Sequence, residues 1–142
     1  MMTTAFKYIM RSLGILFFVF IFTATSCKKK NETTTGSAVI SGDATVIGQV
    51  MHHTWSVPNC KVYIKKNCSS FPGRSPSLYN SYLTADGSGY ISFDKLANGN
   101  YFFYAVGYDP AMIDTVWGYN SVVINNKPGE TKEYDLIIPV SE

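Results

Sequence analysis

Short runs of alternating apolar residues fill most of the chain from residue 39 to residue 142. Apolar side chains recur at every second position within 46–50, 60–64 and 91–93. Alternation of this kind places the apolar side chains on one face of a β-strand, so each run marks a face that points into a core. No apolar stripe with the 3.6-residue period of a helix occurs in this part of the chain. The pattern therefore predicts an all-β fold.

Turn residues divide these runs from one another. Residues 86–89 (DGSG), 97–100 (ANGN) and 126–129 (NKPG) combine residue types that favour turns, and their glycines tolerate a positive φ. Further strands are expected within 115–124 and 132–140. Seven short strands in about 100 residues are typical of a two-sheet β-sandwich.

The first 26 residues have a different character. Lys7 and Arg11 precede an apolar run at 13–22 (LGILFFVFIF), and small or polar residues follow. This order is that of a secretory signal peptide. A ten-residue helix would span about 15 Å, roughly half of a bilayer's ~30 Å hydrocarbon core, which argues against a transmembrane helix. We expect a signal peptide over 1–26, with a buried core helix as the alternative.

The sequence Ala24-Thr25-Ser26-Cys27 resembles the lipobox of bacterial lipoproteins, although Ala24 stands where leucine is usual. The resemblance implies cleavage before Cys27 and lipid on its thiol and amino group, and several acyl chains would anchor the protein stably to a membrane. Lys28 rather than aspartate follows the cysteine, which favours the outer membrane. An ordinary secretory cleavage that leaves a free Cys27 is the alternative.

Charge divides the remainder into a tether and a domain. Two of the twelve Lys and Arg residues precede Cys27, which leaves ten against all ten Asp and Glu residues. This balance argues against a nucleic-acid partner. Residues 27–38 carry three lysines and no aromatic or large aliphatic residue, so they predict a flexible tether. Residues 39–142 form the expected β-sandwich domain.

A series of short motifs runs through residues 44–140. They are Gly48-x-Val50, Val57-Pro58-Asn59-Cys60 leading into Val62-x-Ile64, Thr84-Ala85-Asp86 ahead of Gly89-x-Ile91-x-Phe93-x-x-Leu96, Gly99-x-Tyr101 and Gly107-Tyr108-Asp109. The series resembles the carboxypeptidase regulatory-like, transthyretin-like (prealbumin-like) domains of bacterial surface lipoproteins. The resemblance implies a seven-stranded Greek-key sandwich without catalytic residues that serves as an accessory, spacing or binding module. It implies no particular ligand and no functional residue.

Cys60 and Cys68 form an even pair once Cys27 is lipidated, and an oxidising compartment permits disulfides. If the strand ran extended between them, their Cα atoms would lie more than about 20 Å apart, whereas a disulfide needs roughly 4.4–6.8 Å. A sharp reversal at 65–67 would allow the bridge. Otherwise Cys60 is expected to be a small buried core residue.

Few residues suggest chemistry. His52 and His53, with Asp43 or Asp109, are conceivable metal ligands, but adjacent histidines on an extended segment point to opposite sides, so we expect loop histidines without a metal. The sequence contains neither a phosphate-binding glycine loop nor a Gly-x-Ser-x-Gly nucleophile motif. We therefore expect neither an enzyme nor a cofactor, with a small hydrolase as the weakest alternative.

Aromatic residues are the remaining signal. The run 101–108 is bulky on both faces, whereas a strand with one wet face alternates with polar residues. Either the loop at 69–82 or the segment around Trp117 covers the second face, or the face is an exposed platform. The candidate platform residues are Trp55, Tyr108, Trp117 and Tyr119, whose flat rings could stack on sugars or anchor a protein.

Together these features predict a lipid-anchored, non-catalytic accessory or interaction module of a bacterial surface assembly at the outer membrane. A glycan-binding surface lipoprotein that uses exposed Tyr and Trp side chains is the alternative. The expected partners are the membrane, through the lipid, and either a protein or a glycan.

Overall fold

The computed structural model describes residues 42–142, so the expected signal peptide, Cys27 and the tether lie outside the described residues. The described part contains eight strands, one 3₁₀ turn and no α-helix, which confirms the all-β prediction. The elements are β1 (Ala44–His52), β2 (Trp55–Ser56), β3 (Lys61–Lys66), η1 (Pro76–Leu78), β4 (Ser81–Thr84), β5 (Tyr90–Leu96), β6 (Gly99–Asp109), β7 (Asp114–Ile124) and β8 (Lys132–Ser141).

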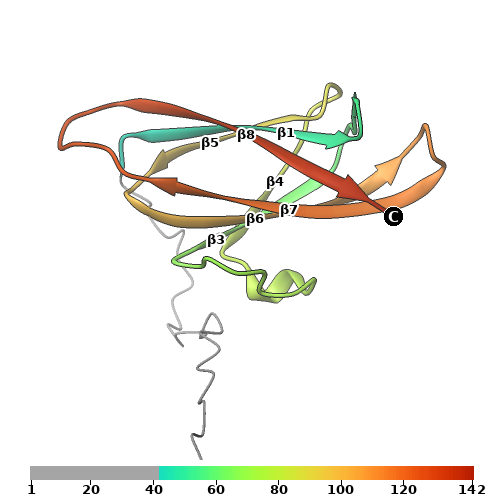
Figure 1. Cartoon of the computed structure of the whole chain (residues 1–142), viewed down its shortest axis with the longest axis horizontal. Helices are drawn as coiled ribbons and strands as arrows, with labels where there is room; N and C mark the ends of the chain where they lie inside the picture. Colours follow the sequence, from blue (N-terminus) through green and yellow to red (C-terminus); the bar gives the residue numbers. More distant parts are fainter. Residues whose placement is uncertain (1–41) are drawn as a thin grey trace, which may run out of the picture.

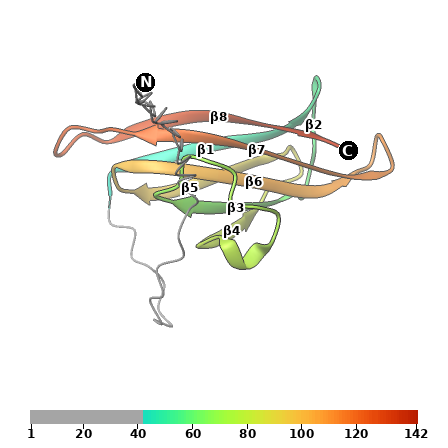
Figure 2. The ribbon, with the colours of Figure 1, turned by 60° about the horizontal axis from the view of Figure 1, so that its bottom comes forward.

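The strands form one curled mixed sheet in the order β2-β1-β8-β7-β6-β3-β4, with β5 paired to the other side of β1. The β1–β8 pair is parallel, and every other pairing is antiparallel. Figure 1 shows β1, β5 and β8 running above β3, β6 and β7, and Figure 2 shows β3 and β4 on the opposite side of the fold from β8. The sheet therefore curls until its two ends enclose a common core.

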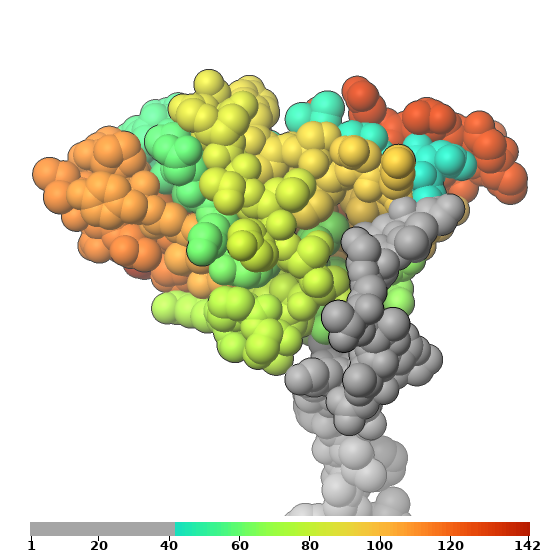
Figure 3. Space-filling view, turned by 180° about the vertical axis from the view of Figure 1, so that it is seen from behind, coloured from blue at the N-terminus to red at the C-terminus, as the bar shows by residue number. Residues whose placement is uncertain are grey.

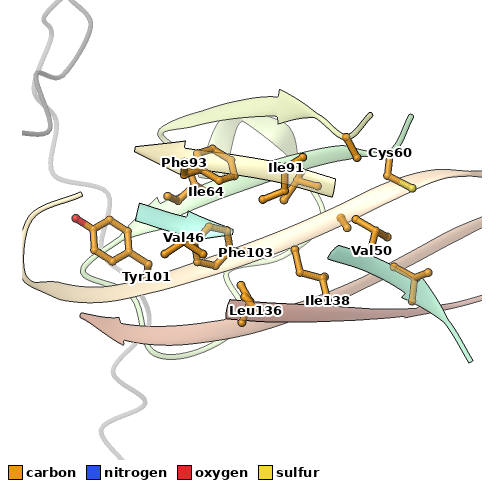
Figure 4. Close-up of a cluster of buried hydrophobic side chains, with 14 of the residues drawn as sticks. Val46, Val50, Cys60, Ile64, Ile91, Phe93, Tyr101, Phe103, Leu136 and Ile138 are labelled. Carbon is orange, nitrogen blue, oxygen red and sulfur yellow. The ribbon is translucent and has the colours of Figure 1, made fainter. Parts of the chain in front are cut away.

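That core forms where the sequence pattern places it. Every second residue of β1 is buried, including Val46 and Val50, and Val62 and Ile64 of β3 belong to the same core. The rings of Phe93 and Phe103 lie 5.5 Å apart and join β5 to β6 across the interior. Figure 4 shows labelled side chains of β1, β3, β5, β6 and β8 converging there.

A glycine marks the place where the two parts of the sheet meet. Strands β7 and β8 pair through two residue pairs alone, Trp117 with Ser141 and Gly118 with Val140. A Cβ atom built on Gly118 would overlap the carbonyl oxygen of Pro139 and lie 2.8 Å from the Cα atom of Val140. Glycine is required here because the two backbones approach too closely for any side chain.

The expected turn at 86–89 is present and is held by a carboxylate. Asp86 Oδ1 accepts hydrogen bonds from the backbone N–H groups of Ser88 (2.8 Å) and Tyr90 (2.9 Å). Gly89 has φ of +78°, which glycine adopts without strain. This turn connects β4 to β5 and leads the chain from one part of the sheet to the other.

Candidate functional site

Four tyrosines form a row across the sheet on the side opposite the core. Tyr82 of β4 pairs in register with Tyr63 of β3, Tyr63 pairs with Tyr104 of β6, and Tyr104 pairs with Tyr119 of β7. Because neighbouring residues in a strand face opposite sides, these rings share the outward side. We call the row, together with the neighbouring rings of Phe102 and Trp117, the aromatic face.

The segment 67–80, which we call the covering loop, folds over the middle of the aromatic face. Its Phe71 ring stacks on Tyr119 with centroids 4.7 Å apart, and it also contacts Tyr104 at 5.9 Å. Its Tyr79 ring lies 5.6 Å from that of Tyr104, which is only 3 % exposed. In Figure 3 this lime-green segment protrudes from the body of the domain. The expectation that a loop covers the second bulky face of β6 is confirmed.

Hydrogen bonds hold the covering loop at its C-terminal end and within the loop itself. The backbone N–H of Asn80 donates to the carbonyl of Ile64 (2.8 Å), and Asn80 Oδ1 accepts from the N–H of Lys66 (2.8 Å). The Tyr79 hydroxyl donates to the carbonyl of Gly73 (2.8 Å). Burial, followed by the nearby Tyr104 hydroxyl, raises the pKa of Tyr79 well above its ordinary value, so this hydroxyl stays a neutral donor.

A pocket of about 380 Å³ opens where the covering loop meets β3 and β4. The Tyr63 ring is its buried base, and the rings of Tyr79 and Tyr82 lie 5.7 and 5.3 Å away, tilted by 46° and 40°. Its volume lies in the ~300–1,000 Å³ range of small-molecule sites. The lining residues are Lys61, Tyr63, Pro76, Ser77, Tyr79, Asn80, Ser81 and Tyr82.

Positive charge gathers around the same rings. Lys61 shares the outward side of β3 with Tyr63, and its Nζ lies 5.6 Å from the centroid of the Tyr82 ring. The Cζ atom of Arg74, from the covering loop, lies 3.4 Å from the centroid of Trp117. The segment 60–84 contains four Lys or Arg residues and no acidic residue. Within the described part of the chain, Lys61 and Arg74 form no ion pair.

The four aromatic residues proposed from the sequence do not form a single platform. Tyr108, Trp117 and Tyr119 lie on the outward side of β6 and β7, where Tyr108 and Tyr119 are 54 % and 45 % exposed. Trp117 is only half-buried, but Arg74 and Phe71 stack on it. Trp55 lies apart from them in β2.

Trp55 instead joins a buried polar cluster at the ends of β1, β2 and β6. Asp109 Oδ2 accepts hydrogen bonds from Trp55 Nε1 (2.9 Å) and His52 Nδ1 (2.8 Å), and Asp109 Oδ1 accepts from the N–H of Ala111 (2.8 Å). An ionised carboxylate only accepts, so His52 carries its proton on Nδ1. His52 Nε2 has no hydrogen-bond partner among residues 42–142 and lies 3.8 Å from Glu142 Oε1.

The expectation that His52 is a loop histidine is wrong. It is the last residue of β1 and continues the buried alternation of that strand, while His53 occupies the following turn and is exposed. Asp109 likewise continues the inward positions of β6, so the spacing of the alternation was the signal that could have found this pair. The hydrogen bond between His52 and Asp109 joins the end of β1 to the end of β6. Both side chains are fully buried, so neither is accessible to a substrate.

The cluster also sets two pKa values. Burial would raise the pKa of Asp109, but hydrogen bonds from Trp55, His52 and the backbone of Ala111 and Met112 lower it to about 2. Burial, together with the negative charge of Asp109, raises the pKa of the Cys60 thiol to about 11. A thiol in this state is a poor nucleophile and metal ligand.

Cys60 lies in the core with a free thiol, so it does not form a disulfide with Cys68. Strand β3 carries the chain away from Cys60, as the argument from extended geometry requires. Cys27, the expected lipidation site, lies outside the described residues. Among residues 42–142, no three His, Cys, Asp or Glu side chains come together as a metal site would need.

These features define an all-β domain with an aromatic, cationic outer face. No protein-family model matches the chain, and no curated protein is significantly similar to it. Within the described residues, no helix has the length and apolar character needed to cross a membrane.

Proposed function

We propose that this chain is a lipid-anchored, non-catalytic accessory or interaction module of a bacterial surface assembly at the outer membrane. The basic, apolar and small segments of residues 1–26, followed by Cys27, support the anchor. The aromatic face supports the interaction. Tyr and Trp rings are enriched in protein interfaces because they supply a large contact area at a low cost in conformational entropy.

The proposal includes a prealbumin-like, seven-stranded Greek-key sandwich of the carboxypeptidase regulatory-like kind. The curled sheet supports it, because β1, β5 and β8 pack across one core from β3 and β6. The described residues contain one strand more than the seven of such a sandwich. The extra strand is β2, which has two residues and pairs only with β1. A sandwich without catalytic residues suits a module that positions or binds other proteins.

One observation carries the proposal: exposed rings lie beside cations on one face of the domain. Tyr108 of β6 and Tyr119 of β7 are about half exposed, and Arg74 lies over the ring of Trp117, which shares their outward side. Arginine and aromatic side chains dominate the binding energy of protein interfaces. Exposed apolar patches on a soluble domain often mark the sites where it binds other molecules.

A photo-crosslinking amino acid introduced at Tyr119 in cells tests the interaction. Tyr90 of β5 is the matched control, since it is also a half-exposed tyrosine but belongs to the other part of the sheet. We expect a discrete adduct from position 119 and none from position 90. The same adducts from both positions, or none from either, would contradict a partner on the aromatic face.

Lipid labelling tests the anchor separately. Cells fed a labelled fatty acid should incorporate it into the wild-type protein and not into the Cys27→Ser variant. Equal labelling of the two proteins would refute lipidation at Cys27, and it would leave the aromatic face untouched.

Glycan binding is the second candidate, and the pocket beside Tyr82 favours it. Three tilted tyrosine rings offer flat apolar surfaces to a sugar, and polar side chains surround them. A glycan array probed with the wild-type protein, Tyr82→Ala and Trp117→Ala would decide. Binding that is indifferent to both substitutions would exclude stacking on this face.

A further inference from the structure

We infer that the pocket between Tyr63, Tyr79 and Tyr82 is a binding site for acidic sugars, with a pyranose ring against the tyrosines and its carboxylate directed to Lys61. The inference rests on the second candidate function, because it names the class of glycan and the site. Ring geometry, unused polar groups and charge support it independently.

The ring geometry suits a flat, ring-shaped ligand. Tyr63 is fixed between two strands and has little exposure, whereas Tyr82 is 52 % exposed, although it pairs with Tyr63 in register. The rings of Tyr79 and Tyr82 are tilted by 46° and 40° to that of Tyr63, and all three line the same open pocket. Rigid rings already in place reduce the ordering cost that binding must overcome.

Polar groups at the rim are free to bind hydroxyls. Asn80 uses its side-chain oxygen to accept from Lys66 N–H, which leaves its amide NH₂ without a partner within residues 42–142. The Ser81 hydroxyl likewise has no protein partner within those residues. A few oriented polar groups beside apolar rings are what small-molecule sites use to fix a ligand's orientation.

The charge of the rim selects an anion. Lys61 lies over the Tyr82 ring and faces no carboxylate among the described residues, and Lys65 shares its side of β3. The surrounding segment 60–84 has no acidic residue, and within residues 42–142 neither Lys61 nor Lys65 forms an ion pair. A carboxylate held above Tyr82 would meet an ammonium group already in position. A neutral sugar would leave that charge unused.

Titration of the full-length chain, solubilised in detergent, with uronic-acid oligosaccharides tests the inference. The probes are oligogalacturonate, oligomannuronate and hyaluronan fragments, each compared with its methyl ester, which keeps the rings and removes the charge. We expect at least one acid to bind more tightly than its ester, and raised salt should remove much of that advantage.

Two substitutions separate the contributions. Lys61→Gln should weaken binding of the acid roughly fivefold, which is about 1 kcal/mol at 1.4 kcal/mol per tenfold, and should leave binding of the ester unchanged. Tyr82→Ala should weaken both by roughly tenfold, because it removes a stacking ring. Lys95→Gln and Tyr90→Ala, which alter β5, are the matched controls and should change neither affinity.

Each other outcome overturns the inference. Equal binding of acid and ester that depends on Tyr82 would reject the acidic-sugar specificity and keep the glycan candidate. Binding of none of these probes, together with a blank glycan array, would reject both. Tighter binding of single-stranded oligothymidylate than of any uronate would assign the pocket to nucleic acid instead.

Discussion

Replacing Gly118 by alanine should strongly destabilise the domain, because the added methyl group would meet the backbone of the neighbouring strand. The new Cβ atom would overlap the carbonyl oxygen of Pro139 and lie 2.8 Å from Val140 Cα, whereas ordinary contact begins at 3.4 Å. Strands β7 and β8 would have to separate by roughly 0.6 Å at that atom alone, and by more at the oxygen. Both obstructing atoms belong to the backbone, so no change of rotamer relieves the overlap.

Overpacking of this kind costs about 1–3 kcal/mol, and a backbone obstacle places Gly118→Ala near the upper end, about 3 kcal/mol. For a domain of about 100 residues, this corresponds to a fall in Tm of roughly 12–24 °C. Gly87→Ala is the matched control, because its new Cβ would meet nothing within 4 Å. Its free energy of unfolding should lie within about 0.5 kcal/mol of that of the wild type.

Urea denaturation followed by circular dichroism, with thermal melts in parallel, measures both variants. If the free energies of unfolding of Gly118→Ala and Gly87→Ala differ by less than about 0.5 kcal/mol, the two strands do not approach as closely as described. The described pairing of β7 with β8 at Gly118 would then be wrong.

The remaining predictions concern the core cysteine and the buried carboxylate. Because its pKa is about 11 rather than 9.0, the Cys60 thiol has roughly a hundredfold less thiolate at pH 8 than an ordinary cysteine. Mass spectrometry should find Cys60 unmodified by iodoacetamide in the native protein and alkylated in urea, and rapid native labelling would argue against its burial. Asp109 has a folded pKa of about 2 against 3.8 when unperturbed, so its contribution to stability is complete above about pH 4 and is lost as the pH falls through 2. The stability difference between wild type and Asp109→Asn, measured by urea denaturation, should therefore shrink from pH 5 to pH 2; a difference independent of pH would contradict the proposed hydrogen bonding.

Alternation in the sequence predicted the strands that have a buried face, because burying one face of a strand requires it. It did not predict β2, which has only two residues. It predicted the inward positions of Val46, Val62 and Phe93, and it also predicted that something covers Tyr104. It did not predict which rings meet, since the register between β3, β4, β6 and β7 depends on tertiary pairing. The tyrosine row and the pocket therefore became visible only in the structure.

The burial of His52 could not be predicted from its residue type. His52 has the right spacing to continue the buried face of β1, but a polar residue beside a turn is usually exposed. A histidine is buried at little cost when a carboxylate accepts a hydrogen bond from its ring N–H, and Asp109 lies 57 residues later in the chain. Only the fold brings the two together.

The distribution of charge reconciles a nearly neutral domain with an anion site. From residue 39 onward seven basic residues face nine acidic ones, yet four of the seven lie within 60–84, where there is no acid. Overall balance argues against a partner with an extended phosphate backbone, which needs several cations spread over a long surface. A single carboxylate needs only one or two cations at a defined place. The pocket beside Lys61 offers that number on a base of tyrosine rings, and so favours a small acidic ring over a long polyanion.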